Sequence, residues 1–226
     1  MSTLTRQSKA GNYAFLLSGL LLLFILIPLL SIFPALAKNI LLMRIMVQVG
    51  YSTLMLLGIW GLSRENYFFK FGLALALLGV AFTTINIFYA GIVIELCLKA
   101  VVLLFSVSSA VIATRHVFGG TKVDSNLIFG AMCVYLLMGL IWAILYGLTF
   151  QFLPGSFNGI EGIDGKAPMD TLLYYSFVTL ASLGYGDITP VAPLARTLAY
   201  LEVVGGQLYI AIMLAGLVGL FLHDRR

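Results

Sequence analysis

Charged residues are scarce in this chain of 226 residues. Asp, Glu, Lys and Arg together make up 10% of the sequence, whereas 61% of the residues are hydrophobic. The mean hydropathy is +1.06. Such a composition excludes an ordinary soluble domain and indicates an integral membrane protein with several spans. We therefore expect the lipid bilayer as a partner, and no nucleic acid.

Cysteine and histidine are also rare. Cys97 and Cys133 both lie within apolar runs, so buried thiols are expected rather than a disulfide framework. His116 and His223 are isolated, and the sequence has no zinc-ligand spacing, phosphate-binding loop or nucleophile elbow. We expect neither enzyme activity nor a cofactor.

Long apolar runs, in contrast, fill most of the chain. A helix needs about 20 mostly apolar residues to cross the hydrocarbon core of a bilayer. Six runs are long enough, namely 13–37, 40–62, 71–89, 91–113, 127–149 and 197–222. The predicted fold class is an all-α membrane protein with six transmembrane helices.

The first run has features of a signal peptide. Arg6 and Lys9 precede it, and it ends in small residues around Ala35 and Ala37. Its apolar stretch is longer than the roughly 7 to 15 residues typical of a signal peptide, so an uncleaved span is favoured over a mature chain beginning at Lys38.

Basic residues predict the orientation, because they accumulate on the cytoplasmic side of short loops. With six spans and the amino terminus inside, the inner side receives Arg6, Lys9, Arg64, Lys70, Arg115, Lys122, Arg225 and Arg226. The outer side receives Lys38, Arg44, Lys166 and Arg196. We expect a multi-pass protein of the cell membrane with both termini in the cytoplasm, and the loop between the fifth and sixth spans outside.

That outer loop contains the most informative motif, Thr179-Leu180-Ala181-Ser182-Leu183-Gly184-Tyr185-Gly186-Asp187. Successive backbone carbonyls can point the same way only if some residues adopt positive φ, which glycine does without steric cost. Gly184 and Gly186 alternate with other residues as that geometry requires.

Residues 179–187 resemble the potassium-channel signature T-x-T-T-V-G-Y-G-D. Ala181 and Ser182 stand in place of two threonines and Leu183 in place of valine, although Ser182 keeps a hydroxyl. In such filters rings of backbone carbonyls from four chains replace the water shell of K⁺. The resemblance implies that the permeant K⁺, and no other metal, is bound by Ser182, Leu183, Gly184, Tyr185 and Gly186.

The resemblance implies further roles around the filter. Asp187 and Thr179 would support it, as would an aromatic cuff of Tyr174 and Tyr175, although lipid-interface packing is an alternative for the two tyrosines. An inner-helix hinge would lie at Gly205 and Gly206, where close helix packing is the alternative. Ile210 and Leu214 would line the pore.

The chain then divides into four parts. Residues 1–12 form a cytoplasmic amino terminus, 13–113 a four-helix, sensor-like membrane domain, 114–126 a cytoplasmic linker and 127–226 a pore domain. The pore domain comprises an outer helix (127–149), a turret (150–169), a re-entrant pore helix (170–181) with Asp170 as its N-cap, the filter (182–187) and an inner helix (197–222). Glu161, Asp164 and Asp170 make the turret acidic, either to concentrate cations or merely as a solvated loop.

Intramembrane charges are few. The fourth run carries only Lys99, with Arg115 just past its end, so we expect weak voltage gating or none. Glu95 lies four residues before Lys99, which favours a structural ion pair over a role in ion transport. Glu202 has no basic neighbour in sequence, and it either forms hydrogen bonds behind the pore helix or faces the vestibule.

A closed ring of carbonyls needs four chains, so we expect a homotetramer. The expected function is passive, potassium-selective conduction. A non-selective cation channel of the same architecture is the nearest alternative. A secondary transporter is less favoured, because the first half shows no second broken helix. The last span ends close to Arg226, so we expect no soluble regulatory domain.

Overall fold

A computed structural model describes residues 12–32, 49–58, 66–88, 91–120, 123–162 and 167–224. The described part is almost entirely helical, as the apolar runs predict. Three of its helices are long and apolar enough to cross a membrane: Ile92–Gly119, Ser125–Phe152 and Pro193–Leu222. The small residues at the end of the first run, most of the second run and Asp164 lie outside the described residues.

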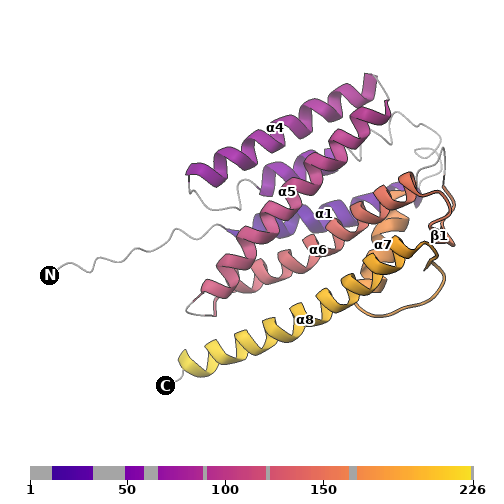
Figure 1. The fold of residues 1–226 in the computed structure, drawn as a ribbon. Helices are drawn as coiled ribbons and strands as arrows, with labels where there is room; N and C mark the ends of the chain where they lie inside the picture. Colours follow the sequence, from indigo (N-terminus) through magenta and orange to yellow (C-terminus); the bar gives the residue numbers. More distant parts are fainter. Residues whose placement is uncertain are drawn as a thin grey trace.

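The elements follow one another along the chain as shown in Figure 1. They are α1 (Tyr13–Ile32), a short helix (Val49–Gly58), α4 (Asn66–Phe88), α5 (Ile92–Gly119), α6 (Ser125–Phe152), β1 (Phe157–Asn158), α7 (Met169–Leu180), β2 (Thr189–Pro190) and α8 (Pro193–Asp224).

Several helices extend beyond their predicted ends. Helix α5 continues to Gly119, through part of the expected linker, and Gly120 follows it in an extended conformation. Helix α8 begins at Pro193 rather than at 197. Proline fits the first position of a helix because that residue has no intrahelical partner for an N–H group. Hydropathy marks the part of a helix that suits lipid, whereas the helix itself continues until a local signal ends it.

The helices α4, α5, α6 and α8 lie side by side in that order, and α1 packs against α6 (Figure 1). The core centres on α6, whose Leu137, Leu140 and Ala143 are fully buried. Helix α8 differs, because only 11% of its most apolar window is buried, against 56% for α6. The single chain therefore leaves a long apolar face of α8 uncovered.

Two side chains at the start of α6 accept hydrogen bonds from backbone N–H groups. Asp124 is its N-cap, and its side chain accepts from the backbone N–H of Leu127 over 2.7 Å. Asn126 Oδ1 accepts from the N–H of Tyr13 over 2.9 Å. The first turn of a helix has backbone N–H groups without intrahelical partners. Asn126 thus satisfies one of those groups and joins the start of α1 to α6.

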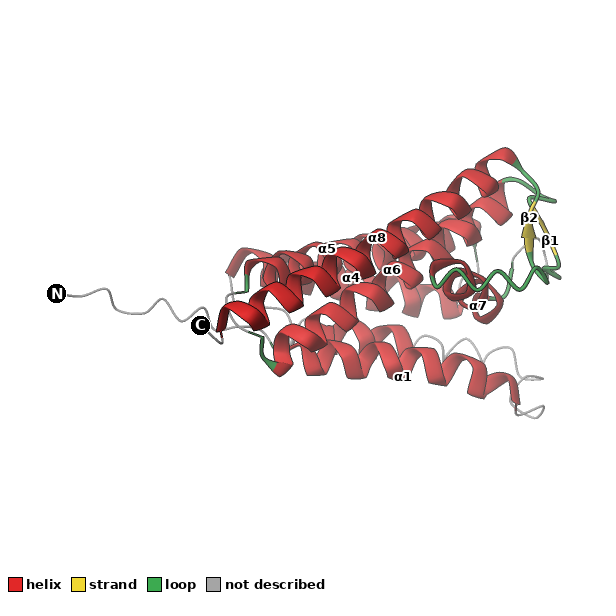
Figure 2. Cartoon of the chain, turned by 90° about the horizontal axis from the view of Figure 1, so that it is seen from below, coloured by secondary structure: helices red, strands yellow, loops and turns green. Residues whose placement is uncertain are grey.

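The predicted turret is more ordered than its turn-forming composition indicates. Its β1 strand pairs antiparallel with β2, with Phe157 opposite Pro190 and Asn158 opposite Thr189. Figure 2 shows this pair at one end of the molecule, beside α7. The pairing joins the loop before α7 to the segment after the filter motif, so both flanks of the motif are held together.

Candidate functional site

Helix α7 leads directly into the filter motif, which comprises the predicted filter residues 182–187. It begins at Met169, with Pro168 at the N-cap position and no side-chain capping bond. The prediction of Asp170 as N-cap is therefore wrong, because the helix starts at Met169 and the N-cap lies two residues before Asp170. Asp170 lies in the first turn, where its Oδ1 accepts from the N–H of Thr171 over 2.9 Å and its charge suits the helix dipole.

The chain turns sharply after α7 and uses its amide groups to do so. The N–H of Ser182 donates to the carbonyl of Thr179 over 2.9 Å, and that of Leu183 donates to Val178 over 2.8 Å. The first amides of the motif thus point back to the end of α7. Thr179, expected to support the filter, contributes through its backbone carbonyl.

The backbone of the motif alternates in conformation. Ser182, Gly184 and Gly186 have φ of +58°, +59° and +81°, whereas Leu183 and Tyr185 between them do not take positive φ. Ser182 is the one non-glycine residue with positive φ in the described part of the chain. Alternation of left-handed and ordinary residues turns successive carbonyls toward one side. A row of carbonyl oxygens formed in this way is a candidate site for a dehydrated cation.

The outer end of the motif is attached to α7. Tyr174 donates its hydroxyl to Oδ2 of Asp187 over 2.7 Å, and this hydrogen bond lowers the pKa of the Asp187 carboxyl. The Tyr174 ring also stacks on Tyr185, with centroids 6.5 Å apart. Gly159, with φ of +81°, lies so close that a Cβ there would be 2.0 Å from the carbonyl oxygen of Asp187. The turret and α7 therefore both contact this end.

The two adjacent tyrosines of α7 have different surroundings. Tyr174 is 41% exposed, whereas Tyr175 is buried. The ring of Tyr175 meets Tyr146 of α6 edge-on at 4.8 Å and Phe157 of β1 at 5.5 Å. Of the predicted cuff, Tyr174 contacts the motif itself and Tyr175 packs α7 against the outer elements.

Glu202 of α8 lies behind α7 and is completely buried. Its Oε2 accepts from the hydroxyl of Tyr146, and its Oε1 lies 2.5 Å from the hydroxyl oxygen of Ser176. Ser176 also donates to the carbonyl of Gly139 over 2.8 Å. Of the two placements left open by the sequence, Glu202 takes the one behind α7, the helix predicted as the pore helix. Its partners Tyr146 and Ser176 carry no local sequence signal.

Helix α8 approaches the end of α7 at Gly206. A Cβ at Gly206 would lie 2.6 Å from the carbonyl oxygen of Leu180, whereas one at Gly205 would meet only Met138 Cε at 3.8 Å. Gly206 therefore allows close packing, the alternative to a hinge. The next residue, Gln207, donates from Nε2 to the hydroxyl of Ser182 over 2.9 Å. Gln207 is a site residue that the sequence analysis missed.

Farther along α8, the predicted pore-lining residues Ile210 and Leu214 are 44% and 62% exposed in the single chain. No cluster of three or more His, Cys, Asp and Glu side chains occurs within the described ranges. The candidate cation ligands are the backbone oxygens of the motif.

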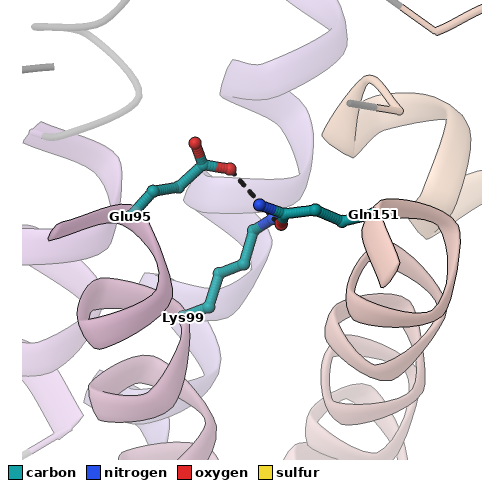
Figure 3. A network of polar contacts seen from close by, with 3 residues as sticks. All are labelled: Glu95, Lys99 and Gln151. Atoms are coloured by element: carbon teal, nitrogen blue, oxygen red, sulfur yellow. Dashed lines mark hydrogen bonds and ion pairs between the residues drawn. The ribbon is translucent and has the colours of Figure 1, made fainter. Parts of the chain in front are cut away.

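The charged pair in α5 lies outside the motif. Lys99 forms an ion pair of 2.9 Å with Glu95 and donates to Oε1 of Gln151 at the end of α6 over 2.7 Å. Figure 3 shows the three side chains converging between the two helices. The predicted pairing is present, and the hydrogen bond from Lys99 to Gln151 joins α5 to α6.

Comparison with known proteins identifies the segment that contains this site. Residues 130–222 match an ion channel family. The prediction that the chain is not an enzyme is confirmed by this match. The matched segment contains α7, the motif and nearly all of α6 and α8.

Two plant proteins are similar to part of the chain. "Two pore potassium channel c" of Oryza sativa subsp. japonica is 35% identical over 89 residues, which is 39% of this chain and 19% of the relative. "Two-pore potassium channel 5" of Arabidopsis thaliana is 31% identical over 87 residues, 38% of this chain and 19% of the relative. The chain thus aligns with about a fifth of the length of either relative. No solved structure matches.

Proposed function

We propose that the protein is a potassium-selective channel that conducts passively through a pore built from four copies of the chain. The observation that carries the proposal is the alternating positive φ of Ser182, Gly184 and Gly186, in a segment that matches an ion channel family. Part of the chain is also similar to two potassium channels. Carbonyl oxygens arranged in this way can replace the water shell of K⁺.

The proposal of a fourfold assembly is supported by the apolar surfaces that are exposed in a single chain. Leu183 and Tyr185 are 55% and 65% exposed, although apolar side chains of a filter need surroundings that hold its diameter. The apolar face of α8 is uncovered as well. Neighbouring copies around a central axis would bury both surfaces, and cyclic symmetry closes such an assembly. Ile210 and Leu214 would then line the path below the filter.

Six spans, of which 13–113 would contribute four, remain our proposal for the topology, with both termini in the cytoplasm. Voltage dependence is expected to be weak or absent. The fourth span carries Lys99, and Lys99 is engaged by Glu95 and Gln151. A charge held in this way is suited to joining helices rather than to moving through the membrane field.

Reversal potentials in mixed K⁺ and Na⁺ solutions test the proposal against its alternatives. The purified protein in planar bilayers should give unitary currents that reverse close to the K⁺ equilibrium potential. Reversal midway between the two equilibrium potentials would indicate a non-selective cation channel. Saturating flux coupled to a gradient, without unitary currents, would indicate a transporter.

A further inference from the structure

The inner end of the filter motif is contacted by a side chain from another element. Gln207 of α8 donates from Nε2 to Oγ of Ser182 over 2.9 Å, although the residues are 25 positions apart in sequence. Both side chains are exposed in the single chain. Neither is therefore enclosed among the helices of its own subunit.

Gly206 makes this contact possible. A Cβ at this position would lie 2.6 Å from Leu180 O and 2.8 Å from Leu180 Cδ1. Because glycine has no Cβ, α8 can pass this close to the end of α7. Gln207, as the next residue, is thereby brought within reach of Ser182.

A hydrogen-bond partner restricts the rotation of the Ser182 side chain. Threonine has two heavy atoms on Cβ and is stiff at χ1, whereas serine rotates more freely among staggered rotamers. A hydroxyl that changes rotamer presents its oxygen to a cation for only part of the time. A hydroxyl oxygen has two acceptor lone pairs. One can accept from Gln207, and the other then stays available in a fixed direction.

We propose that Gln207 is a positioning residue, which holds the Ser182 hydroxyl as a ligand at the inner end of the filter. Four such pairs, one in each subunit, form an ordered ring of hydroxyl oxygens and contribute to the preference for K⁺ over Na⁺. This inference rests on the proposed function. It assigns Gln207 an effect on ion preference that acts through one hydroxyl group.

The test is a double-mutant cycle read by the K⁺/Na⁺ permeability ratio. The ratio comes from the reversal potential, so it does not depend on how many channels fold or open. The proteins compared are wild type, Gln207→Met, Ser182→Ala and the double variant. Methionine keeps the approximate length of glutamine but has no N–H donor. Leu208→Met serves as the control, because Leu208 is the next residue and is 55% exposed.

Gln207→Met should lower the permeability ratio about fivefold, the factor that corresponds to one net hydrogen bond. The double variant should have the same ratio as Ser182→Ala alone, because no hydroxyl remains to be positioned. Leu208→Met should keep the wild-type ratio. An unchanged ratio in Gln207→Met, independent effects of the two substitutions, or an equal loss in Leu208→Met would contradict the inference.

Two further outcomes are decisive. If Gln207→Met gives no current, Gln207→Leu is used in its place. If neither conducts while Ser182→Ala does, Gln207 does not act through the hydroxyl and the inference is wrong. A wild-type protein without K⁺-selective current would instead overturn the proposed function itself.

Discussion

The hydroxyl of Tyr174 donates a 2.7 Å hydrogen bond to Oδ2 of Asp187 and so joins α7 to the last residue of the filter motif. Both residues are exposed in the single chain. Residues 182–186, whose carbonyls are the proposed ligands, lie between these two residues in sequence. Loss of this one hydroxyl should therefore affect the filter more than the fold.

Tyr174→Phe removes the hydroxyl and keeps the ring that stacks on Tyr185. We expect tetramers of unchanged thermal stability but currents that decline during sustained conduction, because Asp187 loses its attachment to α7. Single-channel recording of open duration measures this. Open times equal to those of the wild type would show that the bond does not support the filter.

External acid should reproduce the same effect. The bond from Tyr174 lowers the pKa of Asp187, so its contribution is complete above the ordinary carboxylate pKa of about 3.9 and is lost as pH falls through the lowered value. The current of the wild type should thus persist into more acidic external solution than a carboxyl of ordinary pKa would allow. Tyr174→Phe should lose current at a higher pH than the wild type. Identical pH profiles would contradict this assignment.

Glu202 should matter for stability through its hydrogen bonds. Glu202→Ala leaves the buried hydroxyl of Tyr146 without its acceptor, which costs about 1 to 3 kcal/mol, whereas the hydroxyl of Ser176 keeps the carbonyl of Gly139 as an acceptor. Glu202→Gln keeps an acceptor for Tyr146 and a group that can pair with Ser176. Thermal unfolding followed by circular dichroism should therefore show a large loss for Ala and a small one for Gln. Equal losses would mean that the negative charge, rather than the hydrogen bonds, is required.

The two glycines of α8 form a matched pair for testing the hinge. Gly206→Ala places a Cβ against the carbonyl of Leu180, whereas Gly205→Ala meets only ordinary contacts. If close packing is the reason for glycine here, Gly206→Ala should reduce tetramer yield and Gly205→Ala should behave as wild type. Normal assembly with a similar reduction in opening for both variants would favour a hinge.

Voltage dependence is checked at Lys99. Since Lys99 is paired with Glu95 and Gln151, Lys99→Gln should leave the slope of the conductance–voltage curve unchanged, and that slope should already be shallow in the wild type. Thermal stability should decrease, because partly buried Glu95 loses its ion-pair partner. A steep wild-type curve that flattens in Lys99→Gln would contradict the structural role.

The sequence predicts features that depend on near neighbours. The alternating glycines predict positive φ at Gly184 and Gly186, and the spacing of Glu95 and Lys99 predicts their ion pair. Both predictions depend on local sequence alone. Glycine has no Cβ and so tolerates positive φ, and residues four apart share a helix face. Helix ends were less predictable. Hydropathy continues across a terminus, whereas Pro193 and Gly120 lie where α8 begins and α5 stops.

The contacts around the filter could not be predicted in the same way. Glu202 is recognisable as a costly intramembrane acid, but Tyr146 and Ser176 become its partners only when three helices pack together. In sequence, Gln207 is an ordinary polar residue. Its contact with Ser182 depends on the close approach of α8 to α7 at Gly206. The strand pair β1–β2 is too short to leave a pattern of alternation in sequence. These relationships depend on tertiary structure.

The most direct test of the filter compares potassium flux from liposomes containing the wild type, Gly184→Ala and Gly155→Ala. Both glycines have positive φ, and neither has a neighbour within 4 Å of an added Cβ, so the two substitutions impose similar local strain. Only Gly184 belongs to the filter motif. We expect K⁺ flux without comparable Na⁺ flux from wild type and Gly155→Ala, and loss of that flux in Gly184→Ala. Equal K⁺ flux from all three proteins would contradict the assignment of residues 182–187 as a selectivity filter.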